Sequence, residues 1–345
     1  MAIEIDAKTA LKNQREAKAD WTVARRRLRR GVVVPIHRAS FQLKASDTVF
    51  TMGSCFARNI EKHLVKFGCR VPVHEFSLPA SERLSATPNQ ALTLFTPPLF
   101  SQTIEWVEKI YSRDCKVTAE DCEQWLFLYP DGSALDLGLA AAKPVAAQRA
   151  IERRQEIFDL YANVFSAECV MMTPGLVEAW FDHQHCIYTN SAPIKDGALL
   201  DEQRYSFRVL NHEDCYQSLV RVIDLIRKHN RAVKFLVTVS PVPLRYTFSD
   251  RDILIANTYS KSVLRSACGQ LVTDRTGIDY FPSFETVNLS TWRVWQKDRR
   301  HVSDALVDRI VKAVIAQYFR AQTESELSEL QYPFFQRIWR TTFGF

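Results

Sequence analysis

Two nucleophilic side chains, Ser54 and Cys55, lie in the hexapeptide Met-Gly-Ser-Cys-Phe-Ala at residues 52–57. The apolar run at residues 49–52 predicts a buried strand, and the apolar residues that follow the hexapeptide recur at the spacing of one helix face. Both side chains would then lie at a helix N-terminus, where free N–H groups and the helix dipole favour negative charge. Such a position favours the thiolate and offers donors to an oxyanion, so it suits acyl transfer.

An aspartate and a histidine that could activate this nucleophile lie near the other end of the chain, in Asp298-Arg299-Arg300-His301. In a turn, side chains three residues apart can point the same way, so the Asp298 carboxylate can accept the N–H of His301. The other ring nitrogen is then free to act as a general base. Taken separately, the first motif also fits an ordinary Gly-Ser turn with a buried cysteine, and the second also fits a charged surface loop. Their joint presence favours a catalytic site.

The elements that would position these residues alternate between strands and helices. Short apolar runs predict buried strands at residues 47–52, 169–173 and 235–239. Amphipathic spacing predicts helices at residues 56–67, closed by Gly68, at 211–229, at 257–268, and from Ser303 onward. This alternation predicts an α/β fold with a mostly parallel sheet and helices on both faces.

Ligands of parallel α/β sheets bind at the carboxyl ends of the strands. Each predicted strand is followed there by a turn whose residues could take part in binding or catalysis. These turns are Gly53-Ser54-Cys55, Pro174-Gly175 and Ser240-Pro241. We therefore expect these three turns to meet at one site.

The remaining segments predict an extension, an insertion and a tail. Residues 8–30 predict a weakly amphipathic helix, and residues 70–74 a second strand. Residues 76–98 hold four prolines and predict a loop with a broken helix at 89–95, while residues 100–165 predict helices interrupted by a short hairpin at the Tyr129–Gly132 turn. We divide the chain into an N-terminal helical extension (1–44), a main domain (45–320) with a helical insertion or lid at about 76–165, and an aromatic C-terminal tail (321–345).

Composition narrows the class of protein. The chain is 46% hydrophobic and 24% charged, as in soluble globular proteins, and no run of residues is long and apolar enough to span a membrane. Five positive charges of the net +6 lie in residues 25–30, which we interpret as the solvated end of the N-terminal helix; the nearly neutral remainder predicts no nucleic-acid partner. The eight cysteines form no Cys-x-x-Cys pair, and the polar first twenty residues hold no signal core, which predicts a cytoplasmic protein with free thiols.

The sequence resembles the GSCFA family, whose name is the string Gly53-Ser54-Cys55-Phe56-Ala57. Further segments are similar to that family: the Gly-Leu-x-Glu-x-Trp pattern within residues 173–180, the Ser-Pro-Val-Pro pattern within 238–244, the segments 257–265 and 280–285, and the closing Asp298…His301. The resemblance covers roughly residues 45–315. The family is grouped with SGNH or GDSL-type hydrolases, which implies a flavodoxin-like sheet and ester hydrolysis or acyl transfer, often on carbohydrate acyl groups.

The resemblance suggests roles for individual residues. Aligning Gly-Asp-Ser-Leu with residues 53–56 puts Cys55 at the nucleophile position, although Ser54 remains an alternative. The usual Gly-x-Asn-Asp block is missing, so the oxyanion or substrate-binding residues have to be sought elsewhere. The candidates are Gly53, Gly175, Asn89 and Glu178. Asn89 also fits a helix N-cap, and Glu178 also fits a structural salt bridge.

These observations predict a covalent acyl-enzyme that acts on oxygen esters, including O-acyl groups of carbohydrate. In this mechanism Cys55 attacks, His301 takes its proton, Asp298 orients His301, and the N–H groups of Cys55 and Gly175 bind the oxyanion. No cofactor is needed. Metal binding is not expected, since His183, His185 and Cys186 fit a hairpin tip. The alternative is a non-catalytic binding or assembly protein of the same fold. The aromatic tail is expected to dock on its own domain or to form a homo-oligomer.

Overall fold

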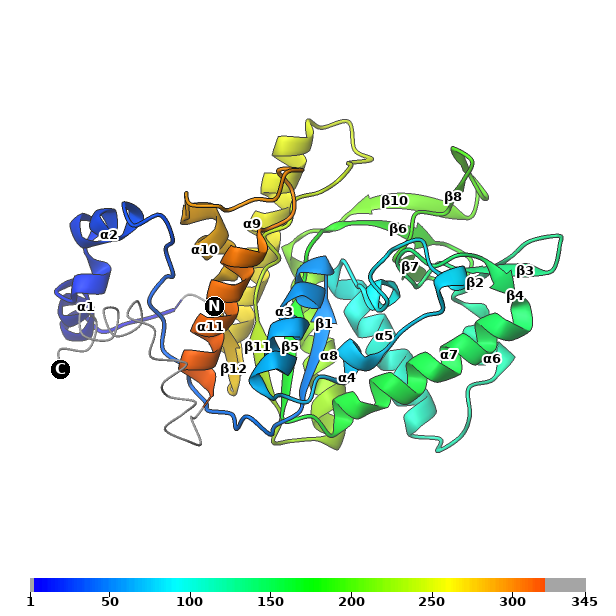
Figure 1. Cartoon of the computed structure of the whole chain (residues 1–345), viewed down its shortest axis with the longest axis horizontal. Helices are drawn as coiled ribbons and strands as arrows, with labels where there is room; N and C mark the ends of the chain where they lie inside the picture. The colour runs from blue at the N-terminus through cyan, green and yellow to red at the C-terminus, as the bar shows by residue number, and fades with distance from the viewer. Residues whose placement is uncertain (1–2, 320–345) are drawn as a thin grey trace.

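A four-stranded parallel sheet forms the centre of the protein (Figure 1). The computed structural model describes residues 3–319. The strands are β1 (Val49–Gly53), β5 (Cys169–Thr173), β11 (Lys234–Val237) and β12 (Ile278–Tyr280), in the order β1-β5-β11-β12. Every pair in this sheet is parallel. Almost all residues of these strands are buried, as their apolar runs predict. The predicted α/β fold is confirmed.

The strand order is flavodoxin-like because the chain visits the edge beside β1 before it crosses to β5. That edge position holds only a parallel bridge between Thr48 and Arg70. The strand predicted at 70–74 is therefore wrong: helix α4 (Pro72–Glu75) begins two residues after the bridge. The proline at its first position has a backbone angle already suited to a helix and lacks the N–H that a strand would need.

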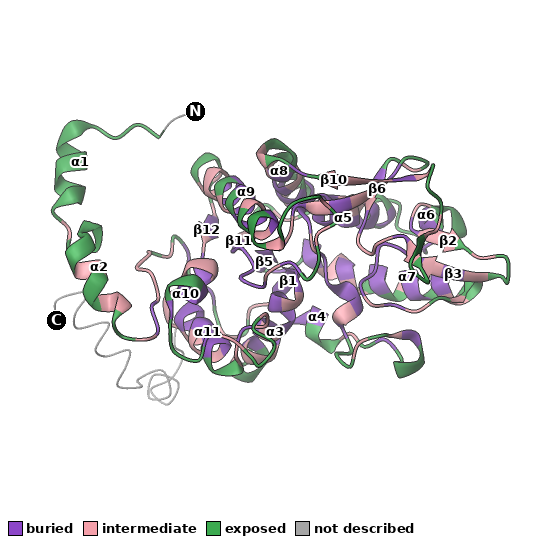
Figure 2. Ribbon diagram, turned by 90° about the horizontal axis from the view of Figure 1, so that it is seen from above, coloured by how far each residue is buried: buried purple, intermediate pink, exposed green. Residues whose placement is uncertain are grey.

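Helices cover both faces of the sheet, and the alternation of strand side chains separates two hydrophobic layers (Figure 2). Phe50 and Met52 of β1 belong to the layer under α5 (Pro97–Tyr111), α8 (His212–His229) and α9 (Ile253–Asp274). Val49 belongs to the opposite layer, with α3 (Cys55–Phe67) and α11 (Asp304–Tyr318). The short α10 (Ser283–Leu289) lies beside α11.

Capping residues fix where the main helices begin. Ser54, Asn211 and Ser303 each accept a backbone N–H from the first turn of the helix that follows. Gly68 closes α3 in a left-handed conformation with a φ of 106°. These boundaries agree with the sequence-based expectation. Helix α9 is longer at both ends than the predicted 257–268.

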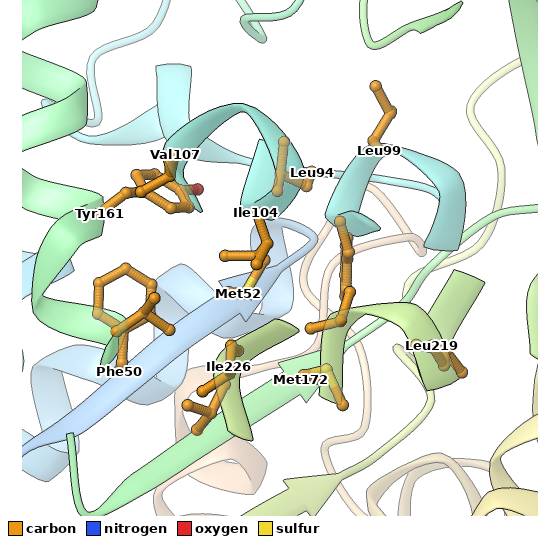
Figure 3. Packing of buried hydrophobic residues seen from close by; sticks show 14 of the residues in the cluster. Phe50, Met52, Leu94, Leu99, Ile104, Val107, Tyr161, Met172, Leu219 and Ile226 are labelled. Carbon is orange, nitrogen blue, oxygen red and sulfur yellow. The ribbon is translucent and has the colours of Figure 1, made fainter. Parts of the chain in front are cut away.

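The insertion at 76–165 is a structural part of the core. Ile104 and Val107 of α5 and Tyr161 of α7 (Ala147–Tyr161) pack over Phe50 and Met52 of β1 (Figure 3). The expectation of a lid is therefore not met by α5 and α7. The hairpin predicted near residue 130 is present as β2 (Leu126–Leu128) and β3 (Ser133–Asp136), joined by β4 (Val145–Ala146). The short helical pieces of this region are η2 (Ala80–Glu82), η3 (Gln90–Leu92), α6 (Ala119–Glu123) and η4 (Ala162–Phe165).

A second, antiparallel sheet was not anticipated. It has the order β10-β6-β7, formed by β10 (Tyr205–Val209), β6 (Glu178–Asp182) and β7 (Ile187–Thr189). The small hairpin of β8 (Ile194–Lys195) and β9 (Ala198–Leu199) lies between β7 and β10 in the chain. Because β6 begins five residues after β5 ends, this sheet extends from the carboxyl edge of the central sheet.

The N-terminal extension contains two helices, α1 (Ala7–Gln14) and α2 (Trp21–Leu28), with a 3₁₀ turn η1 (Ala17–Ala19) between them, rather than the single helix expected over 8–30. Neither helix has a buried residue, and both project away from the sheet (Figure 2). The tail at 321–345 lies outside the described residues. Within residues 3–319, no helix combines the length and apolar character needed to cross a membrane.

Candidate functional site

The turn between β1 and α3 requires a glycine. Gly53 has a φ of 149°, and a β-carbon on it would lie 2.6 Å from the carbonyl oxygen of Thr173, its partner on β5. Its own carbonyl accepts the N–H of Leu94. Gly53 thus allows β1 and β5 to approach closely and brings Ser54 and Cys55 to the first turn of α3.

Ser54 and Cys55 have different surroundings. Ser54 is only 3% exposed, and its hydroxyl accepts the Phe56 N–H at 3.3 Å as the N-cap of α3. Cys55 is partly exposed and lines a cavity of about 320 Å³. Its N–H is the first of the helix and has no intrahelical acceptor. The geometry therefore favours Cys55 over Ser54 as the residue that meets a substrate.

The Asp298–His301 turn is the tip of a tight loop before α11. The loop is closed by an antiparallel bridge between Trp295 and Val302, and Arg299 at its tip has a left-handed φ of 58°. The Asp298 carboxylate accepts the backbone N–H groups of Arg300 and His301, each at 3.0 Å. These bonds hold the pKa of Asp298 well below its usual range.

The His301 ring is held by a carboxylate and two further neighbours. Its Nδ1 lies 2.5 Å from Oδ2 of Asp298, and its Nε2 lies 3.2 Å from Nη1 of Arg300. Because a guanidinium can only donate, Nε2 acts as an acceptor and Nδ1 carries the proton. A hydrogen bond with the Cys55 side chain raises the pKa of His301, and the bond to Asp298 raises it further. Partial burial and the positive charge of Arg300 act to lower this pKa, but they do not outweigh the two bonds. The structure thus brings Cys55, His301 and Asp298 together.

Gly175 lies beside Ser54 but has a different role from the expected one. A β-carbon on Gly175 would be 3.1 Å from that of Ser54, so a larger residue would crowd the turn. Its N–H donates to the Phe95 carbonyl at 3.0 Å, as does the N–H of Leu176. This corrects the assignment of Gly175 as an oxyanion donor, because its only backbone donor is already used.

Asn89 is likewise committed elsewhere. Its amide donates to Glu61 at 2.8 Å and to the Val73 carbonyl at 2.9 Å, and its side chain is buried. Asn89 precedes η3, but no side-chain capping bond is formed there. This corrects its assignment to the site: Asn89 completes a buried cluster around Glu61 instead.

Glu178 does line the cavity that Cys55 and His301 share. Its Oε1 accepts the Thr247 hydroxyl at 2.8 Å, while its Oε2 is buried and has no hydrogen-bond partner within the described part of the chain. Within residues 3–319, Glu178 does not form the salt bridge with an arginine that was the expected alternative. Glu178 therefore has an acceptor available for a ligand.

Several cavity residues were missed by sequence reasoning. The rings of Trp180, Phe207 and Phe248 form edge and tilted contacts with one another on one wall, and Arg300 lies beside His301 on another. Trp180 and Phe207 face each other across β6 and β10. The available signal was the alternation of apolar and polar residues at 205–209, which is typical of a strand with one solvated face. Residues 178–182 show no such alternation.

The histidines near β6 have partners unrelated to this cavity. His183 Nε2 lies 2.9 Å from the Ser206 hydroxyl, and His185 Nδ1 lies 3.1 Å from Asp182. In the range 3–319, no three His, Cys, Asp or Glu side chains come together as a potential metal site. All eight cysteines are free thiols.

Comparison with known proteins agrees with the motifs that build this site. The chain matches the model of the GSCFA family over residues 48–313, a range that includes Cys55, Glu178, Asp298 and His301. A search of the curated proteins found no match. Since the matched range is well over half of its length, the chain belongs to the GSCFA family.

Proposed function

We propose that this protein is an acyl-transfer enzyme that forms a thioester on Cys55 from an oxygen ester, as an ester hydrolase or an O-acyltransferase. The observation that carries the proposal is the grouping of Cys55 and His301 on one cavity, with Asp298 bound to His301 and Cys55 at the N-terminus of α3. A sulfur nucleophile, an oriented base and a helix N-terminus are the components of covalent acyl transfer.

The first half-reaction uses the proton acceptor on His301. Nε2 takes the thiol proton of Cys55, the sulfur attacks the carbonyl carbon, and a carbon–sulfur bond forms as the carbonyl becomes an oxyanion. When the oxyanion collapses, the carbon–oxygen bond to the alcohol breaks, and the imidazolium returns its proton to the leaving oxygen. Asp298 supports the positive charge that His301 carries between these steps.

The second half-reaction regenerates the thiol. Water, or a hydroxyl of an acceptor, loses its proton to His301 and attacks the thioester carbon. The carbon–sulfur bond then breaks, and Cys55 recovers the proton. The acid is released if water attacks, and a new ester forms if an alcohol does.

Two donors are suitably placed for the oxyanion. The N–H of Cys55 is free of helical partners, and the Arg300 guanidinium lines the same cavity beside His301. Arg300 is fixed by a second bond, from Nε to the Pro243 carbonyl at 3.1 Å. We propose these groups in place of Gly175 and Asn89.

The residues that line the cavity suit a substrate with a bulky alcohol or acyl group. Trp180, Phe207 and Phe248 offer aromatic faces, and the unpartnered Oε2 of Glu178 offers a hydroxyl acceptor. Aromatic faces beside a hydrogen-bonding group suit a sugar ring, which agrees with O-acyl carbohydrate as a substrate class.

Acetylation by p-nitrophenyl acetate tests the proposal. Intact-mass measurement of the wild-type protein should find one acetyl group that is absent from Cys55→Ala and retained in Ser54→Ala. Cys186→Ala is the matched control, because that thiol is exposed and lies outside the cavity. An adduct lost only in Ser54→Ala would move the nucleophile by one residue. A folded protein that is neither acetylated at this position nor active on any acyl donor would favour the alternative, a non-catalytic binding or assembly protein.

A further inference from the structure

Lys261 is the most deeply buried cation near Cys55, and the mechanism above does not use it. It lies in α9 and is only 2% exposed. Its Nζ donates to the carbonyl of Gly175 at 2.7 Å and to that of Val242 at 2.7 Å. Two carbonyl groups satisfy two N–H bonds, but they do not neutralise the charge of an ammonium group.

The two carbonyls belong to two different segments, the turn after β5 and the loop after β11. Gly175 abuts Ser54 and thus belongs to the wall that carries the nucleophile. Val242 is followed by Pro243, whose carbonyl binds Arg300, the neighbour of His301. One buried side chain therefore ties the turn after β5 to the loop that supports the histidine.

The charged groups around Lys261 and Cys55 come from four elements. Cys55 is on α3, while Arg300 and His301 are on the loop before α11. Glu178 of β6 and Arg245 of the loop after β11 line the same cavity. Burial lowers the pKa of Lys261 to about 7, the charge of Cys55 acts to raise it, and the charge of Arg300 acts to lower it.

We propose that Lys261 is a positioning residue that holds the turn after β5 (Gly175) and the loop after β11 (Val242) together. When it is charged, Lys261 also stabilises the thiolate of Cys55. This inference rests on the proposed function only in taking Cys55 as the reactive group. The two roles of Lys261 are separable, since a neutral amine can still donate to both carbonyls. When Lys261 loses its proton, it therefore no longer stabilises the thiolate, but it still holds the turn after β5 and the loop after β11 in place.

The rate of Cys55 alkylation by iodoacetamide, followed by peptide mass spectrometry, tests this role without any turnover. Only the thiolate reacts, so a nearby positive charge speeds the reaction. Lys261→Met should react about tenfold more slowly than wild type at pH 6, where Lys261 is charged, and within about twofold at pH 9, where it is neutral. Lys66→Met, an exposed lysine at the other end of α3, is the matched control and should match wild type at both values.

A purely structural role would change the rate by the same factor at both pH values, and that result, or no change at all, would overturn the charge role. Lys261→Gln retains amide donors without a charge and should behave like Lys261→Met. Lys261 also lines a neighbouring cavity of about 670 Å³, which leaves room for side chains of similar length.

A second measurement keeps Lys261 intact. In protein labelled with ¹³C-lysine, the ε-carbon of Lys261 should titrate well below the ordinary lysine value of about 10.4. Its midpoint should fall further in Cys55→Ala, because the thiolate acts to raise it. An unchanged midpoint would show that the two charges are not coupled. Because neither measurement needs an acyl substrate, failure of the proposed function would appear separately, as absence of the acetyl adduct.

Discussion

Helix α3 carries two polar clusters that are built in opposite ways. The candidate catalytic cluster (Cys55, His301, Asp298) lies at its first residue, and the Asp298 and His301 side chains are 47% and 34% exposed. The ionic cluster (Arg58, Glu61, Thr51, Asn89) lies about one turn further on, where the side chains of Arg58 and Glu61 are 3% and 0% exposed. Glu61 accepts from Thr51 and Asn89 and pairs with Arg58 at 2.9 Å.

The difference shows how a polar cluster for stability is distinguished from one for chemistry. Both carboxylate oxygens of Glu61 are used, and the cluster is closed to solvent. In the candidate catalytic cluster, by contrast, Cys55 and His301 line a cavity. Substitutions in the ionic cluster should therefore change the free energy of unfolding, whereas those in the candidate catalytic cluster should change rates.

The largest effect is expected from His301→Gln. Removing the base and the imidazolium should lower the rate of acetylation by p-nitrophenyl acetate by about 10²–10⁴-fold. The side chain is partly exposed, so the thermal midpoint should change little. Release of p-nitrophenolate and a melting curve on the same sample measure both quantities. A wild-type rate in this variant would remove His301 from the mechanism.

Glu61→Ala should reverse this pattern. It leaves the Arg58 charge buried without its partner, which costs about 3–5 kcal/mol of folding free energy. Urea unfolding measures this loss, and the folded fraction should alkylate at Cys55 at close to the wild-type rate. A variant that loses reactivity but not stability would contradict the division between the two clusters.

Asp298→Asn should have a smaller effect on rate and a distinct effect on pH dependence. Asp298 helps to raise the pKa of His301, so without its charge the imidazolium loses its proton at lower pH. His301 cannot take the thiol proton while it is protonated, so the acidic limb of the pH–rate profile should move to lower pH. The maximal rate should fall by about tenfold. A limb that stays in place would show that the Asp298 charge does not reach the ring.

Ser54→Ala should have the smallest effect of these substitutions, because the acetylation rate and the free energy of unfolding should both change only slightly. Loss of the N-cap bond should cost about 1 kcal/mol of folding free energy, measured by urea unfolding. Acetylation of Cys55 should continue within about threefold of the wild-type rate. Ser54→Thr, which can still cap the helix, is the control and should recover the lost stability.

The central α/β framework could be predicted from the sequence because its signals are local. Apolar runs identified β1, β5 and β11, and amphipathic spacing identified α3. Capping residues identified the starts of α8 and α11. The pairing of Cys55 with Asp298 and His301 was expected from the joint presence of the two motifs and from the resemblance to the GSCFA family. The parallel-sheet rule did not predict it, because the Asp298–His301 loop does not directly follow a strand.

What could not be predicted depends on long-range partners. Nothing near Gly175 in the sequence indicates that the Phe95 carbonyl accepts its N–H. Nothing near Asn89 indicates that the Glu61 carboxylate accepts a hydrogen bond from its side-chain amide. The buried amine of Lys261 likewise has partners 86 and 19 residues away. Hydrogen bonds of this kind are set by tertiary packing, which residue spacing alone does not encode.

The loop with the histidine comes just before the last described helix, while the cysteine opens the first helix of the domain. During synthesis on a ribosome, the thiol therefore emerges long before the group that would activate it. On the proposed mechanism, Cys55 gains its general base only after the closing segment has emerged and docked. Assembly of the whole domain would then keep an unfinished chain from acylating itself.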